Sequence, residues 1–290
     1  MTIDFEQLAL LDLAGDYRPF YKYRNFPAEK NVCAEKTINY LDKLADSKVW
    51  FASPLSFNDP FDCQIPAEWF SKDEEENRRR YAAYARKKDC PEERVSAAVE
   101  EAMNNPSLNP KDEDSRWDMN CKMQHDIIER GVSILALSRD AKSALMWSHY
   151  SDCHRGFVIG YNAEKLVTSL GNELNPNLVL RNVKYSKEMP SKVDPRNASD
   201  VAHVLRVKHK DWCYEEEYRF MLFRQDGKVL PGVELPIPNS VVESITFGLK
   251  TSKNDQARLR DRISHWPEQP QFYEVKPKQP YSFELDIVPA

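Results

Sequence analysis

The sequence predicts an α+β fold, with mixed and antiparallel sheets around a central cleft and one helical insertion. Short runs rich in β-branched and aromatic residues alternate with helical patterns, without a regular strand–helix–strand repeat. A charge-dense stretch over residues 72–131 carries helical patterns alone. At 290 residues, of which 41% are hydrophobic, the chain can build a sizeable core. We therefore expect a single domain over residues 1–290.

The segments before the insertion predict two strands and a helix. Residues 20–24 (Phe-Tyr-Lys-Tyr-Arg) alternate aromatic and basic side chains, as a strand with two different faces does. A helix is indicated by the spacing of Ala34, Ile38, Leu41 and Leu44. Residues 49–53 (Val-Trp-Phe-Ala-Ser) then predict the second strand.

Residues 72–131 form the helical insertion, between the second and third strands. Prolines at positions 91, 106 and 110 divide three helical candidates. Asp73 suits a helix N-terminus, and Gly131 suits the end of the last helix. We interpret the insertion as an elaboration of the packing. A lid or a surface for a protein partner is the functional alternative.

The segments after the insertion are mostly strands. Apolar or alternating runs predict strands at residues 133–138, 156–161, 180–185, 218–223, 241–247, 271–275 and 281–288. A helix over residues 252–265 begins at a Ser N-cap and turns Ala257, Leu259 and Ile263 inward. Strands with helices inserted between them in this way are typical of α+β folds.

Composition excludes several classes of protein. The net charge of −5, from 41 Lys and Arg against 46 Asp and Glu, leaves no overall basic footprint for nucleic acid. No run approaches the roughly 18 apolar residues of a membrane helix, and residues 1–13 lack the pattern of a secretory signal. The six cysteines include no CxxC pair, which favours free thiols in a reducing compartment. We expect a cytoplasmic protein of bacterial character, without a membrane partner.

The most informative segment is the acidic run from Trp212 to Arg219. At the two-residue period of a strand, Glu215, Glu217 and Arg219 share one face. Two acids and a base on one face are solvated, paired with one another, or part of a polar cleft. A salt-bridged edge strand is the structural interpretation. The apolar residues after Tyr218 indicate a buried strand, which favours the cleft.

Basic side chains on the first strand are a second candidate feature. Lys22 and Arg24 share the face opposite Tyr21 and Tyr23. An arginine on a strand can hold a phosphate or carboxylate with two parallel hydrogen bonds. The structural alternative is an ordinary charge on an edge strand.

The loop after the second strand, residues 53–62, is a third candidate. Its prolines constrain the backbone, and it carries Ser53, Asn58 and Asp59. A rigid loop that follows a strand is a good place for ligand-binding groups. Turn formation explains the same residues equally well.

An aromatic and histidine cluster, residues 146–150, is the fourth. On a helix, Trp147 and Tyr150 are neighbours, so they form either a surface for a flat ligand or part of the core. His149 and His154 lack a third nearby ligand, so we expect no metal site. The eight glycines form no P-loop, GxSxG or GxGxxG motif.

Taken in order, these four motifs resemble one family. Residues 21–24, 50–62, 146–157 and 212–219 look like the successive signatures of the bacterial and phage family catalogued as domain of unknown function 2971. The resemblance runs from about Tyr21 to Leu285, and residues 72–129 carry none of the motifs.

A second resemblance suggests a reaction. The order of a basic residue on a first strand, a serine ending a second strand and Glu-x-Glu on a late strand is similar to the ADP-ribosyltransferase fold. The resemblance implies that NAD is the substrate, with Glu217 catalytic and Glu215 acting on the acceptor. The implied cofactor-binding residues are Arg24 or Tyr23 on NAD, Ser53 at the nicotinamide ribose, Tyr150 on the nicotinamide, and Asn58, Asp59, His149 and Arg219 around them. This chain departs from the usual Ser-Thr-Ser, because Pro54 follows Ser53.

We therefore expect an enzyme that cleaves NAD and transfers ADP-ribose to an unknown acceptor, protein or nucleic acid, in anti-phage defence or a toxin system. A hydrolase or nuclease that uses Asp59, His149, Glu215 and Glu217 is one alternative, and a non-catalytic ligand-binding module is another. If NAD binds, Arg24, Tyr150 and Glu217 should converge on one cleft. Convergence of Asp59, His149 and Glu215 around an ion would favour the hydrolase.

Overall fold

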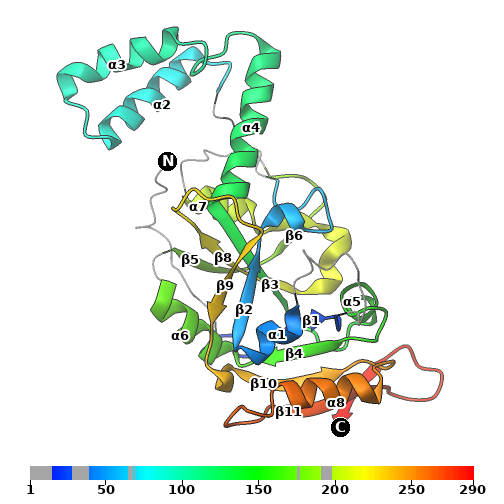
Figure 1. Cartoon of the computed structure of the whole chain (residues 1–290). Helices are drawn as coiled ribbons and strands as arrows, with labels where there is room; N and C mark the ends of the chain where they lie inside the picture. The colour runs from blue at the N-terminus through cyan, green and yellow to red at the C-terminus, as the bar shows by residue number, and fades with distance from the viewer. Residues whose placement is uncertain (1–14, 28–38, 65–67, 69, 175–176, 191–197) are drawn as a thin grey trace.

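One large sheet organises the chain. The computed structural model describes residues 15–27, 39–64, 68, 70–174, 177–190 and 198–290, and ten strands within these residues form this sheet (Figure 1). Its main order is β12 (Leu285–Pro289), β11 (Gln271–Pro277), β10 (Val242–Phe247), β4 (Phe157–Tyr161), β1 (Phe20–Arg24), β3 (Val132–Ser138), β2 (Lys48–Ala52) and β9 (Gly232–Pro236). On the other side of β3 lie β8 (Glu217–Phe223) and then β5 (Leu178–Asn182). The pairing is antiparallel except between β10 and β11, so the expected α+β class with mixed, mostly antiparallel strands is confirmed.

The sheet branches at β3, and this branch makes room for the site. Along one edge, β3 pairs with β8 over its whole length, from Val132 to Ser138. Along the other edge, β2 pairs with β3 at Ile134 and β1 pairs with it at Ser138. Ala136 lies between these two points, and its carbonyl accepts a hydrogen bond from the Lys22 side chain. β1 and β2 therefore diverge from a common neighbour.

Both faces of the central strands are buried. In β3 and β8, Leu135 and Phe220 belong to the larger core cluster, whereas Ile134 and Met221 belong to a second cluster on the opposite face. This explains why these strands read as continuous apolar runs rather than as alternating ones. Glu217 and Arg219 continue the face of Met221, so the strand carries its charges toward the second cluster.

Helices cover the sheet and extend beyond it (Figure 1). Those near the sheet are α1 (Tyr40–Ala45), α5 (Ala144–Tyr150), α6 (Ala163–Leu174), α7 (Ala198–Val204) and α8 (Lys253–Arg262). Short 3₁₀ turns occur at η2 (Pro54–Ser56), η3 (Lys210–Glu215) and η4 (Asn239–Val241), and β6 (Lys184–Ser186) pairs with β7 (Val207–His209) in a separate ribbon. None of the helices in the described residues is both long and apolar enough to cross a membrane.

Residues 72–131 contain α2 (Glu74–Lys87), α3 (Glu92–Asn104) and α4 (Glu113–Gly131). α2 and α3 form a hairpin that projects away from the sheet, and α4 leads back into β3 (Figure 1). Val95, Val99 and Met103 form a small core between α3 and α2. A role of this hairpin as a partner surface stays a prediction.

Several elements differ from the sequence-based expectation. The strand expected over residues 180–185 is two strands, because β5 ends at Asn182 and β6 begins at Lys184. The last strand begins at Leu285 rather than Tyr281, since Tyr281 has a positive φ of 66° in a turn. The helix expected around residues 34–44 is described from Tyr40 onward, and its earlier part lies outside the described residues.

Candidate functional site

A cleft with a volume of about 470 Å³ lies beside the end of β3, where β1 and β2 diverge. Seven parts of the chain line it: β1, α1, the end of β2 with the loop around η2, β3, α5, β7 and the junction of η3 with β8. Its polar and aromatic lining residues include Tyr21, Lys22, Tyr23, Arg24, Tyr40, Ser56, Asn58, Asp62, His149, Tyr150, Asp152, Lys208, Glu215 and Glu217. All four motifs noted in the sequence therefore contribute to one cavity.

Two cations on β1 form one wall of the cleft. The Arg24 guanidinium lies 3.7 Å from the centre of the Tyr40 ring, and Lys22 donates to the Ala136 carbonyl. Within the described part of the chain, neither side chain has a carboxylate at ion-pair distance. Burial, followed by repulsion from Arg24, lowers the pKa of Lys22 to about 7, and burial also lowers the pKa of Arg24. This wall suits an anionic ligand group.

Gly156 explains how β1 is held against α5. A Cβ at this position would lie 2.0 Å from the Arg24 carbonyl oxygen and 2.9 Å from the Ser151 Cβ. Only glycine allows the two backbones to approach this closely. The turn that follows α5 is therefore fixed beside the backbone of Arg24.

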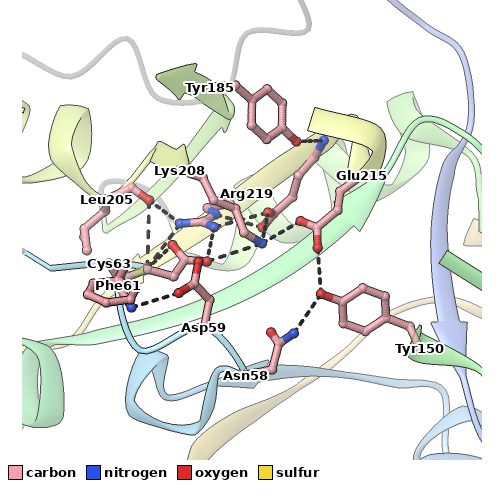
Figure 2. A network of polar contacts seen from close by, with 12 residues as sticks. Asn58, Asp59, Phe61, Cys63, Tyr150, Tyr185, Leu205, Lys208, Glu215 and Arg219 are labelled. Carbon is pink, nitrogen blue, oxygen red and sulfur yellow. Dashed lines mark hydrogen bonds and ion pairs between the residues drawn. The ribbon is translucent and has the colours of Figure 1, made fainter. Parts of the chain in front are cut away.

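A buried charge cluster also borders the cleft (Figure 2). Arg219 is fully buried and donates to both Glu217 oxygens, at 2.8 and 3.2 Å. It also donates to Asp62 at 2.7 Å and to the Leu205 carbonyl at 2.6 Å. Lys208 donates to Glu215 at 2.5 Å and to Glu217 at 3.2 Å, and it lies 3.4 Å from Asp62.

Glu215 and Glu217 lie close together, but not because they alternate along one strand as the sequence predicted. The expectation that Glu215 occupies the same strand face as Glu217 is wrong, because Glu215 ends η3 and β8 begins only at Glu217. Glu216, between them, adopts a left-handed conformation (φ 44°, ψ 50°). The two carboxylates nevertheless converge, since both bind Lys208.

The two glutamates have opposite ionisation tendencies. Burial and then repulsion from Glu217 raise the pKa of Glu215 from 4.5 to about 7. Burial alone would raise the pKa of Glu217 as well, but the positive charges of Arg219 and Lys208 outweigh it and lower that pKa to about 2. Near neutral pH, Glu217 is therefore an anion and Glu215 can gain or lose a proton.

α5 supplies the aromatic side of the cleft. Its N-terminus is capped by Ser143, and the buried Trp147 anchors it through a 2.9 Å hydrogen bond to the Ala141 carbonyl. The Tyr150 hydroxyl donates to Glu215 at 2.6 Å and accepts from Asn58 at 3.3 Å (Figure 2). Exposed His149 lies beside Tyr150, with ring centres 6.5 Å apart.

The structure brings most of the sequence-predicted site residues to the cleft. Those that line it are Tyr23, Arg24, Asn58, His149, Tyr150, Glu215 and Glu217. Tyr23 is nearly buried, and its hydroxyl is already bonded to the Asp140 carbonyl at 2.8 Å.

Ser53, Asp59 and Arg219 do not line the cleft. Ser53 is buried at the start of η2, and its carbonyl accepts hydrogen bonds from Ser56. Asp59 accepts from the Phe61 N–H within its own turn, at 2.9 Å. Arg219 lies beneath Glu217 with no exposed surface, so it positions that carboxylate rather than contacting a ligand.

Sequence reasoning missed Lys208 and Asp62 as site residues. Lys208 lies in an ordinary basic stretch, and its partner β6 pairs with it only in the folded chain. Asp62 ends the loop over residues 53–62. Turn formation already explains the polar residues of this loop, so nothing distinguished Asp62 as a site residue. The positions of Asp62, Lys208 and Arg219 are set by the pairing of distant segments. In the described residues, no group of three or more His, Cys, Asp or Glu side chains could hold a metal ion.

Comparison with known families gives one match. The model of the family described as protein of unknown function (DUF2971) matches residues 146–220. This match supports the resemblance to that family. The matched segment runs from α5 to β8 and contains Tyr150, Lys208, Glu215 and Glu217. No curated protein and no solved structure matches the chain.

Proposed function

We propose that the cleft binds NAD and that the protein is an ADP-ribosyltransferase-like enzyme, which cleaves the nicotinamide–ribose bond and transfers ADP-ribose to an acceptor. One observation carries this proposal: Arg24, Tyr150 and Glu217 line the same cleft, although they come from three distant segments. The cleft volume of about 470 Å³ is in the range of ligand pockets. Consumption of NAD would suit a toxin or an anti-phage defence system.

Each wall of the cleft matches a part of NAD. Lys22 and Arg24, which have no carboxylate partner in the described residues, suit the pyrophosphate. The aromatic side chains of α5 suit the flat nicotinamide ring. The acidic cluster suits the ribose next to the bond that breaks. Ser53 lies outside the cleft, but Ser56 of the same turn lines it and can take the role at the ribose.

The reaction needs a fixed negative charge. As the bond between the ribose C1′ and the nicotinamide nitrogen breaks, its electron pair leaves with nicotinamide and the ribose gains oxocarbenium character. Glu217, held as an anion, stabilises this positive charge. A lone pair of the acceptor then forms the new bond to C1′, and the acceptor's proton passes to Glu215.

The alternative hydrolase has less support. It requires Asp59, His149 and Glu215 around an ion, whereas Asp59 lies outside the cleft lining and its side chain accepts a hydrogen bond from its own turn.

The test is the release of nicotinamide from NAD by the purified protein, compared with Glu217→Gln. This variant keeps the size of the side chain and removes its charge, so turnover should fall by on the order of a hundredfold or more while NAD affinity changes little. Glu216→Gln, at the exposed neighbour, is the matched control. Circular dichroism checks that each variant is folded. Full turnover by Glu217→Gln would refute the catalytic assignment, and NAD binding without nicotinamide release would indicate a binding module.

A further inference from the structure

The Lys208 ammonium lies at the centre of the charge cluster. It is buried and contacts three carboxylates: Glu215 at 2.5 Å, Glu217 at 3.2 Å and Asp62 at 3.4 Å. An ammonium group has three N–H donors, so its donors match its three acidic neighbours. The centre of the Trp212 ring lies 4.9 Å from Nζ.

The cluster contains one more acid than base. Asp62, Glu215 and Glu217 face Lys208 and Arg219, which leaves one excess negative charge if all five groups are ionised. An uncompensated charge is costly to bury, so one of the acids tends to hold a proton. Asp62 and Glu217 each contact both cations, whereas Glu215 contacts Lys208 alone.

We propose that Lys208 is a positioning residue for NAD cleavage: it fixes both glutamates at the cleft, keeps Glu217 ionised and leaves Glu215 as the carboxylate that exchanges a proton. This inference rests on the proposed function. The pKa values of the two glutamates, raised to about 7 and lowered to about 2, agree with this division.

Other groups that face Glu215 support the same division. Tyr150 on α5 donates its hydrogen to Glu215, because Asn58 already donates to the same hydroxyl. Tyr185 on β6 and Tyr214 on η3 both have a pKa above the ordinary value because of burial, so they stay neutral near pH 7. Lys22 on β1, whose pKa of about 7 leaves it partly charged near neutral pH, also interacts with Glu215 and Glu217.

Glu215 itself lines the cleft, so it can exchange a proton there directly. Asn58 and Tyr150 hold its carboxylate in place by hydrogen bonds. A proton taken from the acceptor passes to a Glu215 oxygen while Lys208 stays charged. Turnover should therefore rise with pH as Glu215 loses its proton, with a midpoint near 7.

The test compares Lys208→Met, Lys208→Arg and the exposed control Lys210→Met. Removal of the Lys208 charge should move the pH midpoint of turnover upward by at least one unit, Lys208→Arg should restore it in large part, and Lys210→Met should leave it unchanged. The same shift should occur without NAD in the carboxyl ¹³C NMR signal of Glu215, identified by its loss in Glu215→Gln. An unmoved midpoint in Lys208→Met would overturn the proposal.

The NMR arm separates this inference from the proposed function. If the protein does not cleave NAD, the shift of the Glu215 signal still decides the role of Lys208 in the cluster. If Lys208→Met does not fold, Lys208→Met/Glu215→Gln decides, because it restores the original charge excess. The double variant should fold and lose the midpoint near 7. A double variant that fails to fold, or that keeps the wild-type pH profile, would overturn the proposal.

Discussion

Replacement of Arg219 by Met should destabilise the fold strongly. Arg219 has no exposed surface and is bound to Glu217, Asp62 and the Leu205 carbonyl at distances of 2.6 to 3.2 Å. Met fills most of the space but leaves two buried carboxylates with Lys208 as their shared cation. Removal of one partner from a buried ion pair costs roughly 3–5 kcal/mol in the free energy of unfolding. For a chain of this size that corresponds to a melting temperature lower by on the order of 10 °C.

Thermal and urea unfolding at pH 7 measure this effect. Arg86→Met is the matched control, because Arg86 and Glu92 form an ion pair of 2.6 Å whose side chains are 55% and 70% exposed. Such an exposed pair contributes little to the free energy of unfolding. Arg219→Met/Glu217→Gln should recover part of the loss, since it removes one charge of each sign. If Arg219→Met melts within a degree or two of the wild type, the cluster does not hold the fold as argued.

Two further predictions concern pH and the cationic wall. Because the pKa of Glu215 is raised from 4.5 to about 7, the native chain holds a proton that the unfolded chain has lost, so this group's contribution to stability falls as pH rises through that window. Glu215→Gln should remove that slope and Glu216→Gln should keep it, as urea unfolding at pH 5 and pH 7 would show. Arg24→Ala should weaken the binding of ADP-ribose at least tenfold by calorimetry. Its cost in stability should stay near 1 kcal/mol, the contribution of the lost contact with Tyr40; unchanged affinity with a large loss of stability would make Arg24 structural.

Local periodicity was enough to predict most strands. The strand expected at residues 20–24 is β1. The strand expected at residues 133–138 is β3, which begins one residue earlier, at Val132. The residues of these segments have high β-strand propensity, and their apolar side chains are buried in the fold. Propensity and packing therefore favour the same structure. By contrast, β7 and β9 are short or half-buried and depend on their neighbours, so the sequence pattern did not reveal them.

The site was predictable only in part, because tertiary pairing decides which charges meet. Arg24, Tyr150 and Glu217 could be singled out because their side-chain types are common in binding and catalytic sites, whatever their position in the fold. The role of Arg219 could not be predicted from its position on the strand face alone, since its burial depends on the turn after α7 and on the loop that carries Asp62. Lys208 was missed for the same reason: three carboxylates from two other segments surround it only after folding.

Stability alone is a weak reason for this cluster. A buried set of ion pairs often contributes no more to the free energy of unfolding than well-packed apolar side chains of the same volume. Here the set also contains one more acid than base and lies at the wall of a cleft rather than in the centre of the core. A charge that is costly to bury is most readily explained by a ligand or reaction that needs it. Lys22 and Arg24 line the same cleft, so it holds both negative and positive groups. A ligand that carries anionic phosphates at one end and develops positive charge at the other meets both requirements.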